Sequence, residues 1–420
     1  MIRRPFFSLM RPKLKCVAIE DRVVELTEVG LPARVTLLAG DCDIGSINLK
    51  VGTAVRTGEK LSVSDDVYII STVTGTISAI GEYTGYLSQG YVSISIDVTG
   101  EDQWDDGTLE ALKEPGFEVA RDYLGCIPGK SDFSSLLRSQ PPVNTLVVTG
   151  VDQDLLVLTN QRMILSEDLS AGIEYLKKVT RSGRVILAVG PGFSLADIPG
   201  ADVLAVRPVY PGSLPAMIAR DVLGADYIAG RSFQELGIGF LGAEAVLSLA
   251  GLFDRGEFPV DKVITVIGKD GSAELVKARI GTSVKDILDV LGIETSHGDR
   301  VVLGGPMTGK AIYSEVMPIL ADTDAILVQD RSQVVLSEDV QCVNCGECVR
   351  ACPVGIPVNM LVRLLGRSLY EEAAEQYDLH SCIECGLCNY VCVARIPVFH
   401  HIMLGKQEYF RLKNLEGTHA

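Results

Sequence analysis

Eight of the chain's eleven cysteines fall in two short blocks near the C-terminus, and this feature restricts the fold more than any other. Each block has the spacing Cys-x2-Cys-x2-Cys-x3-Cys, and the second repeats the first at an offset of forty residues. The spacing is typical of chains that wrap two [4Fe-4S] clusters, where the fourth cysteine of each block binds the other cluster. We therefore expect two ligand sets: Cys342, Cys345, Cys348 and Cys392 for the first cluster, and Cys382, Cys385, Cys388 and Cys352 for the second.

Zinc sites and disulfides are the alternatives for cysteines at this density. Four thiolates satisfy one tetrahedral zinc ion, so a third cysteine at the same spacing within each block is not needed. Disulfides need an oxidising compartment, and nothing in the sequence indicates one. Both alternatives explain less of the pattern than two clusters do.

Length and charge limit the remaining choices. A chain of 420 residues is too long for one compact domain. No run approaches the roughly 18 apolar residues of a membrane helix, and the start of the chain lacks the apolar core of a signal peptide. We therefore expect a cytoplasmic chain with no transmembrane segment of its own. The net charge of −16 argues against binding nucleic acid, since phosphates attract basic proteins.

Basic residues nevertheless gather at the N-terminus, where apolar side chains accompany them. The stretch is either a solvated arm or a segment that docks on a membrane surface or a partner. The basic residues are Arg3, Arg4, Arg11, Lys13 and Lys15, and the apolar ones are Phe6, Phe7, Leu9 and Met10.

The region from residue 21 to 100 is rich in strands and glycine. Residues 35–38 form an apolar run of strand length, and residues 93–98 alternate between apolar and polar. Glycine-centred turns near Gly52 and Gly75 resemble those of the barrel-sandwich fold of lipoyl and biotinyl carrier domains. Those carriers present a modified lysine where this chain has Ser64-Asp65-Asp66, so we expect a structural module and no swinging arm.

The next region alternates strands with helices, which predicts a mostly parallel sheet covered by helices. The expected strands are 145–149, 184–189 and 203–206, and the expected helices are 168–179, 214–222 and 243–252. After residue 260, two strands flank Asp270-Gly271, a strong hairpin signal. A helix capped by Thr282 or Ser283 follows, and the unit resembles a β-grasp domain of the soluble-ligand-binding kind.

The fold class is therefore multidomain α/β, ending in a helical domain with both cysteine blocks. Between the blocks, apolar residues from Met360 to Ala373 fall at helical spacing and predict one connecting helix. The expected parts are a basic arm (1–20), a barrel-sandwich domain (21–100), an α/β domain (115–259), a β-grasp domain with the return to the α/β body (260–333), a dicluster ferredoxin-like domain (334–405) and a tail (406–420).

Three further features are weaker. Gly237-x-Gly239-x-x-Gly242 matches a dinucleotide-binding fingerprint, but residues 231–235 are too polar for the strand it requires, so we expect helix packing instead. His380, two residues before Cys382, is either an exposed side chain or a hydrogen-bond donor to a cluster sulfide. The remaining cysteines are isolated thiols: Cys16, Cys42 and Cys126.

The order of these units, ending in two cubane blocks, resembles the C subunit of Rnf-type ion-translocating electron transport complexes across nearly the whole chain. Further matches to that family are Tyr210-Pro211 and Gly304-Gly305-Pro306-Met307. The α/β and β-grasp units are also similar to the flavin-bearing subunit of respiratory complex I. The resemblance implies an FMN that takes hydride from NADH and passes single electrons to the clusters.

The departures from the family fall on its flavin site. The family's FMN loop reads Gly-Gly-Ala-Gly-Phe-Pro-Thr, whereas this chain has Tyr123-Leu-Gly-Cys-Ile-Pro-Gly129. The family's Glu-Cys-Glu-Pro segment becomes Val151-Asp152-Gln153-Asp154, and its Asn-Val segment falls at Gly242-Ala243. These losses argue against a bound FMN. The A subunit of sodium-pumping NADH:quinone reductases is similar to this family and also lacks that flavin site. Any variant flavin region would include Gly125, Gly129, Asp152 and Asp154.

Three hypotheses follow. The first is an electron-transfer subunit whose clusters exchange electrons with other redox subunits, a ferredoxin or a flavoprotein, in a membrane-associated complex at the cytoplasmic face. The second is an NAD(P)H-oxidising FMN/iron–sulfur subunit with a variant flavin site. The third is a scaffold in which the clusters are structural.

Overall fold

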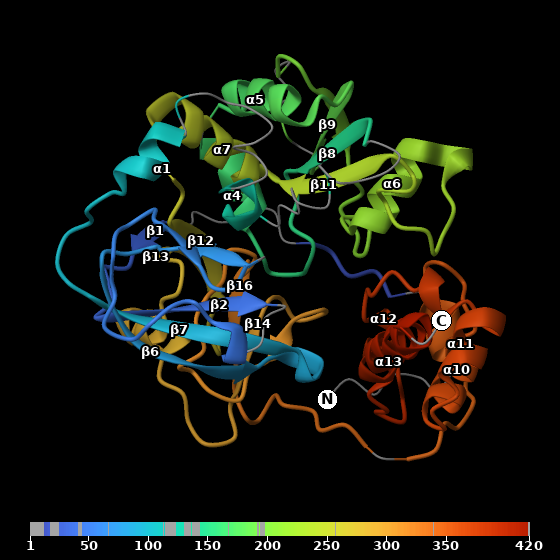
Figure 1. Ribbon diagram of the computed structural model, residues 1–420. Helices are drawn as coiled ribbons and strands as arrows, with labels where there is room; N and C mark the ends of the chain where they lie inside the picture. Colours follow the sequence, from blue (N-terminus) through green and yellow to red (C-terminus); the bar gives the residue numbers. More distant parts are fainter. Residues whose placement is uncertain are drawn as a thin grey trace.

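A computed structural model describes most of the chain (Figure 1). The described residues are 12–16, 25–40, 44–65, 67–111, 113, 123–129, 136, 143–166, 168–190, 193, 198–256, 258–338 and 340–418. Most of the basic arm, Cys42 and Asp66 lie outside them. The end of the arm is described: Lys15 forms an isolated antiparallel bridge with Val209, so this stretch lies on the α/β unit.

The first sheet is curled and antiparallel, with four strands in the order β2-β7-β6-β3. Its strands are β2 (Arg34–Gly40), β3 (Ala54–Val55), β6 (Gly75–Thr84) and β7 (Gly90–Val98), and a separate pair is formed by β4 (Lys60–Ser62) and β5 (Tyr68–Ile70). Val35 lies opposite Ile96 and Leu37 opposite Ile94, and all four side chains are buried in one core. Alternation with period two thus gives the curled sheet one apolar face, as predicted for residues 93–98.

A second sheet has six strands in the order β1-β13-β12-β16-β14-β15. Its strands are β1 (Leu26–Glu28), β12 (Asp261–Ile267), β13 (Ala273–Arg279), β14 (Arg300–Leu303), β15 (Lys310–Ala311) and β16 (Ala325–Gln329). The predicted β12–β13 hairpin is confirmed, and its turn residue Gly271 has φ +80°. Ser283 caps helix α8 (Val284–Val290) by accepting a hydrogen bond from the Asp286 amide. Strand β1 precedes the curled sheet in the sequence but pairs with β13.

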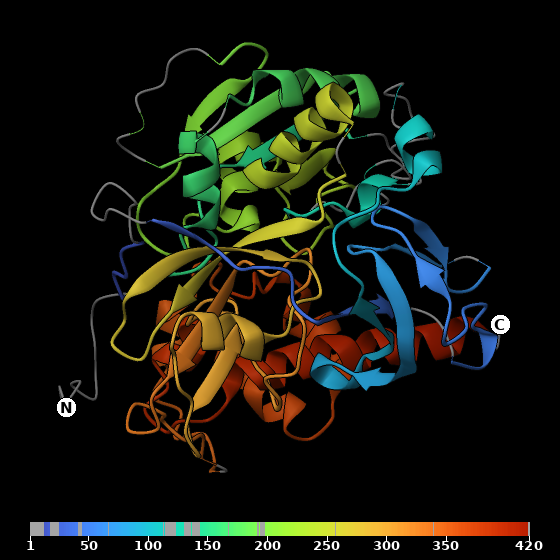
Figure 2. The ribbon, with the colours of Figure 1, turned by 90° about the vertical axis from the view of Figure 1, so that its left-hand side faces the viewer.

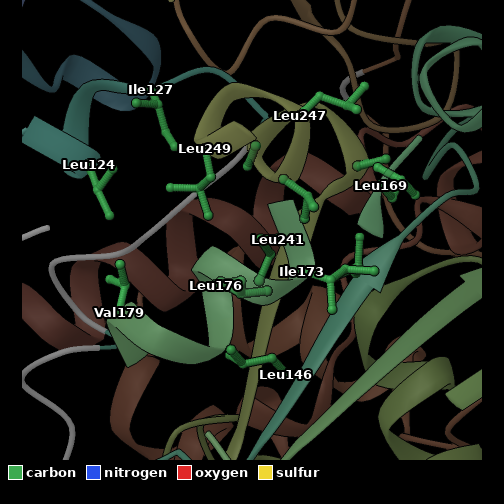
Figure 3. Packing of buried hydrophobic residues seen from close by; sticks show 14 of the residues in the cluster. Leu124, Ile127, Leu146, Leu169, Ile173, Leu176, Val179, Leu241, Leu247 and Leu249 are labelled. Atoms are coloured by element: carbon green, nitrogen blue, oxygen red, sulfur yellow. The ribbon is translucent and has the colours of Figure 1, made fainter. Parts of the chain in front are cut away.

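The third sheet is parallel throughout, in the order β10-β9-β8-β11. Its strands are β8 (Thr145–Thr149), β9 (Arg184–Val189), β10 (Asp202–Ala205) and β11 (Ile238–Gly242), and its helices are α4 (Thr159–Ser166), α5 (Ser170–Thr180), α6 (Pro215–Leu223) and α7 (Ala243–Ala250). Leu146 of β8 packs into one core with Ile173 and Leu176 of α5 and Leu249 of α7 (Figure 3). Leu187 of β9 belongs to the same core, whereas Ile186 packs with Ile218 of α6. The predicted helix-covered parallel sheet is therefore confirmed.

The Gly237-x-Gly239-x-x-Gly242 motif lies on and just before strand β11, and of its glycines Gly242 also packs against a helix, since a Cβ there would lie 2.9 Å from Asn160 Oδ1 of α4. A Cβ atom at Gly239 would lie 2.3 Å from the Leu136 side chain, and one at Gly242 would lie 2.8 Å from the Gly129 carbonyl oxygen. These two glycines let neighbouring segments approach the strand closely.

Buried polar groups join the parallel sheet to the six-stranded sheet. Lys262 of β12 is fully buried and pairs with Glu244 of α7 and, at 3.7 Å, with Asp324. Nearby, Thr265 Oγ1 accepts a hydrogen bond from the Leu158 amide at 3.0 Å. Burial raises the pKa of Glu244 although the Lys262 ammonium acts in the opposite direction. The seam between the two sheets therefore depends on paired charges as well as on apolar contacts.

The C-terminal region is helical and forms its own apolar core. Its helices are α9 (Glu347–Ala351), α10 (Val358–Leu365), α11 (Tyr370–Gln376), α12 (Leu387–Tyr390) and α13 (Val398–Thr418). The single helix predicted between the cysteine blocks is wrong, because a turn with Ser368 at φ +57° separates α10 from α11. The apolar spacing persists because both helices pack on the same core.

Helix α13 ties the helical region to the curled sheet (Figure 2). It runs without a break from residue 398 to 418 and therefore crosses the predicted end of the dicluster domain at residue 405. Gln407 Nε2 donates a hydrogen bond to the Leu87 carbonyl at 2.8 Å, and the His400 ring lies 6.5 Å from the Tyr86 ring. The helical region is thus held at the turn between β6 and β7.

Candidate metal centre

Both cysteine blocks adopt the same local conformation. In each block the residue just before the second cysteine and the glycine just after it have positive φ: Asn344 (55°) and Gly346 (74°), then Glu384 (58°) and Gly386 (68°). Each glycine is the N-cap of a short helix that carries the third cysteine, α9 or α12. Gly386 is also required by packing, since a Cβ there would lie 2.5 Å from the Met307 carbonyl oxygen.

The first predicted ligand set converges on one small cavity of about 20 Å³. Its sulfur-bearing residues are Cys342, Cys345, Cys348 and Cys392. Burial, together with the nearby Cys342, Cys345 and Cys392, raises the pKa of the Cys348 thiol to about 11. Cys392 comes from the second block, so the structure brings the fourth cysteine to the other block's loop.

The second predicted set is brought together in the same crossed way. Burial raises the pKa of the Cys385 thiol to about 12, with Cys382 and Cys352 adding to the effect. Burial also raises the pKa of Cys382, and Cys352 is again among the groups that act on it. Cys348 of the first block is among the groups that raise the pKa of Cys388, so the two sets are neighbours.

The donor sets fit iron–sulfur clusters in their chemistry. Each provides four thiols on winding loops with an apolar surround, and thiolates are the ligands that hold [4Fe-4S] clusters. The walls of the first cavity include Val362, Ile396 and Val398. Among the described residues, no group of three or more His, Cys, Asp or Glu side chains is placed to hold a single metal ion.

Two side chains outside the blocks hold the backbone of the second loop. The hydroxyl of Tyr210, which is 1 % exposed, donates a hydrogen bond to the Cys385 carbonyl at 2.6 Å. Lys406 Nζ of α13 donates to the Cys382 carbonyl at 2.8 Å and pairs with Glu384 at 2.7 Å. The α/β unit and α13 therefore each donate a hydrogen bond to the backbone of the second loop.

Replacing Tyr210 with phenylalanine is expected to leave the buried Cys385 carbonyl without its donor. We expect a loss of about 1–3 kcal/mol in stability, because an unsatisfied buried acceptor keeps its desolvation penalty. We also expect a change confined to the EPR signal of the second set. Thermal unfolding and EPR of the holoprotein measure both effects, with Tyr227→Phe as the control. An unchanged spectrum would show that the hydrogen bond does not shape that site.

His380 lies against α13. Its ring centroid is 4.9 Å from that of Tyr409 and 5.4 Å from that of Phe410. Its Nε2 is buried with no hydrogen-bond partner among the described residues, and burial lowers its pKa.

Two of the four residues of the flavin region line different cavities. Gly125 lines a hollow of about 560 Å³ beside β5, whereas Asp154 lines another of about 520 Å³ between the curled and six-stranded sheets. The Gly129 amide donates to the Ala321 carbonyl, and its carbonyl accepts from the Gly242 amide. This backbone is bonded within the protein and is not free to cradle a flavin.

Both aspartates of that region are also engaged. Asp152 accepts hydrogen bonds from the Asn160 amide and the Gln161 side chain at the start of α4. Asp154 accepts from the amide and hydroxyl of Thr308. Burial raises the pKa of Asp152 to about 6 and also raises that of Asp154. The residues present therefore do not fit the family's flavin cradle.

Comparison with known proteins first identifies the class. Residues 334–393 match the family of 4Fe-4S dicluster domains, so the two cysteine sets imply two [4Fe-4S] clusters. The chain is 25% identical over 355 residues to the C subunit of the proton-translocating ferredoxin:NAD(+) oxidoreductase complex of Clostridium ljungdahlii, covering 78% of this chain and 77% of the relative. It is thus a distant homologue of the C subunits of ion-translocating oxidoreductase complexes, which confirms the resemblance seen in the sequence.

Two further C subunits are similar to this chain. The C subunit of the ion-translocating oxidoreductase complex of Methanosarcina acetivorans is 24% identical over 369 residues, covering 79% of this chain and 82% of the relative. Its counterpart in Yersinia pestis is 25% identical over 343 residues, covering 74% of this chain and 54% of the relative. Among solved structures, a chain of an NAD+-reducing [NiFe]-hydrogenase matches with a TM-score of 0.40 and 11% identity, over 72% of this chain and 62% of that one.

The sequence did not point to every residue at the site. Tyr210 belonged to a matching motif, but only the structure gives it a role at Cys385. Lys406 had no recognisable signal, because its contact depends on how α13 packs. In the part of the chain that the structure describes, no helix combines the length and apolarity that a membrane span requires.

Proposed function

We propose that this chain is an electron-transfer subunit that relays electrons between redox partners in a larger, membrane-associated complex. The observation that carries the proposal is the crossed arrangement, with Cys392 lining the first block's cavity and Cys352 beside the second block's thiols. Clusters of this kind exchange electrons one at a time. Cys342, Cys345, Cys348 and Cys392 would hold one cluster, and Cys382, Cys385, Cys388 and Cys352 the other.

The chain's own residues would shield and orient these ligands. The thiols of Cys385 and Cys388 are buried, which keeps water away from the second set. Tyr210 and Lys406 fix the carbonyls of its loop. The Lys406 ammonium also places positive charge beside this set, which favours the more negative, reduced state and raises its reduction potential.

The partners follow from the relatives. Those proteins are named as subunits of ion-translocating oxidoreductase complexes, in one case for ferredoxin and NAD+. By this likeness, the partners of this chain would be other redox subunits and a ferredoxin or flavoprotein, at the cytoplasmic face of a membrane. The net charge of −16 argues against nucleic acid as a partner.

The domain plan belongs to the same proposal. The curled sheet with its β4–β5 pair supports a barrel-sandwich module, and the six-stranded sheet with α8 supports a β-grasp unit. We keep the domain limits 21–100, 115–259, 260–333 and 334–405. Strand β1 lies within the first of these ranges but pairs with β13 of the third, and α13 extends beyond residue 405.

Anaerobic reconstitution followed by iron, sulfide and flavin assays tests this function. We expect about eight irons per chain, no stoichiometric flavin, and clusters that dithionite reduces to an EPR-active state. Stoichiometric FMN would contradict the relay. Clusters inert at every accessible potential would instead support a structural scaffold.

NAD(P)H oxidation on a bound FMN is the second candidate. The 520 Å³ cavity favours it, because it is lined by Asp154 and by Tyr83, Tyr86, Tyr91 and Tyr313 and lies where three units of the chain meet. The internal bonds of Gly129 and Asp154 weigh against it. NADH-dependent dye reduction with added FMN distinguishes the two functions, and the absence of turnover would remove this candidate.

A further inference from the structure

The two cysteine sets differ in how they face the surroundings. The second set lies against the α/β unit, where Cys385 and Leu387 share a core with Tyr210 and Met217. The cavity of the first set has walls that reach the surface, because Val343 is 58% exposed and Val393 is 40% exposed. A macromolecule can therefore come close to the first set, whereas the second set is covered by the α/β unit.

Exposed apolar side chains lie beside the first set and along the segment that leads to it. Four large apolar side chains of the segment 334–343 are exposed, and with Val393 they form what we call the port patch: Val335, Leu336, Val340, Val343 and Val393. In Figure 1 this segment runs along the lower edge of the molecule between β16 and the helical region. The Glu338 amide donates to the Arg395 carbonyl at 3.0 Å, which fixes the segment to the end of the second cysteine block.

Exposed apolar side chains gathered in this way indicate an interface. The patch adjoins the cavity directly, since Val343 and Val393 belong to both. A surface of this kind next to redox ligands suits a protein that must bring its own centre close to them.

The charges around the port patch differ from those of the whole chain. The net charge is −16, but residues 340–369, which span the first cysteine block and α10, carry three arginines and one acid: Arg350, Arg363 and Arg367 against Glu347. Glu338 and Glu347 are paired with Arg395 and Arg350. Arg363 and Arg367 are exposed, and neither forms an ion pair with another described residue. Arg363 follows Val362, which lines the cavity.

We propose that the port patch is the docking surface for an acidic one-electron carrier protein, which seats next to the first cysteine set. The apolar side chains supply the contact, and the unpaired arginines supply complementary charge, which speeds encounter and selects acidic partners. The proposal rests on the relay function and adds to it the partner's position and charge. It also makes the first set the outer one and the second set the inner one.

Binding of purified carriers to the holoprotein tests the proposal without relying on turnover. The probes are an acidic ferredoxin and an acidic flavodoxin, with cytochrome c as a basic carrier for comparison. We expect the wild type to bind at least one acidic carrier, less tightly as salt is raised, and to bind cytochrome c weakly. Failure of the wild type to bind either acidic carrier would overturn the proposal.

The variant Leu336→Ser/Arg363→Glu removes apolar contact and reverses one charge outside the cysteine loops. We expect a tenfold or larger rise in Kd with iron content and EPR signals unchanged. The control Val290→Ser/Lys50→Glu makes the same chemical changes at exposed positions on α8 and before β3, and should bind as the wild type does. A second pair, Val335→Ser/Arg367→Glu, repeats the test should the first variant lose its clusters.

A second copy of the chain or a membrane at the port patch would give different results in these measurements. A wild-type dimer that the patch variant dissolves, with carrier affinity unchanged, would assign the patch to a second copy of the chain. Lost binding to anionic vesicles with carrier affinity unchanged would assign it to a membrane. Either result overturns the proposal. Clusters that dithionite cannot reduce would overturn the relay, while the binding measurements would still decide the docking surface.

Discussion

Replacing Cys392 with alanine is expected to damage the cluster of the first cysteine block, although Cys392 lies in the second block. Cys392 lines the cavity shared by Cys342, Cys345 and Cys348. Removing one thiolate from a four-thiolate set leaves an iron without its protein ligand. We therefore expect loss or conversion of one cluster while the other stays intact.

Reference variants identify which cluster is affected. Cys345→Ala removes a thiol that belongs to the first block under either assignment, and Cys385→Ala removes one that belongs to the second. The EPR spectrum and iron content of Cys392→Ala should match those of Cys345→Ala, and Cys352→Ala should match Cys385→Ala. Cys126→Ala, at an isolated and partly buried thiol, should retain both clusters. If Cys392→Ala instead matches Cys385→Ala, each block holds its own cluster and the crossed assignment is wrong.

The loop that carries the cysteines of each block could be predicted because a local motif determines it. The spacing of Cys342 to Cys352 forces a tight loop and a short helix, and the same spacing recurs at Cys382. The strand at 184–189 was equally clear, since a continuous apolar run suits a strand buried on both faces. Patterns that act over ten residues or fewer were therefore reliable guides to the fold.

Features that depend on distant contacts could not be predicted. The break between α10 and α11 leaves the apolar spacing intact, so only the backbone at Ser368 shows it. Strand β1 pairs with β13 across nearly 250 residues, and no local signal reports that choice. The flavin region shows the same limit: the missing glycines were visible, but the internal bonds of Gly129 and Asp154 depend on segments far along the chain.

Lys262→Met is expected to be the most destabilising substitution outside the cysteine blocks. Lys262 is fully buried, and its ammonium faces the carboxylates of Glu244 and Asp324. Methionine fills similar space but leaves two buried carboxylates without their positive partner. Breaking a buried ion pair from one side costs about 3–5 kcal/mol. Lys285→Met, at an exposed pair with Asp289, should cost less than about 1 kcal/mol.

The pH dependence separates this charge effect from a simple loss of packing. Burial already raises the pKa of Glu244, and removing Lys262 takes away a group that lowers it. The folded variant therefore binds a proton more readily than the unfolded chain, whose Glu pKa is about 4.3. Its stability falls as pH rises from that value through the raised folded pKa.

Thermal unfolding at pH 5 and pH 8 measures the effect, and the deficit of Lys262→Met should be larger at pH 8. Glu244→Gln in the Lys262→Met background should recover part of the loss at pH 8, because it removes the buried carboxylate charge that Lys262 balances. A deficit that is equal at both pH values and is not relieved by Glu244→Gln would mean that Lys262 acts through packing. The seam between the parallel and six-stranded sheets would then depend on shape and not on its buried charges.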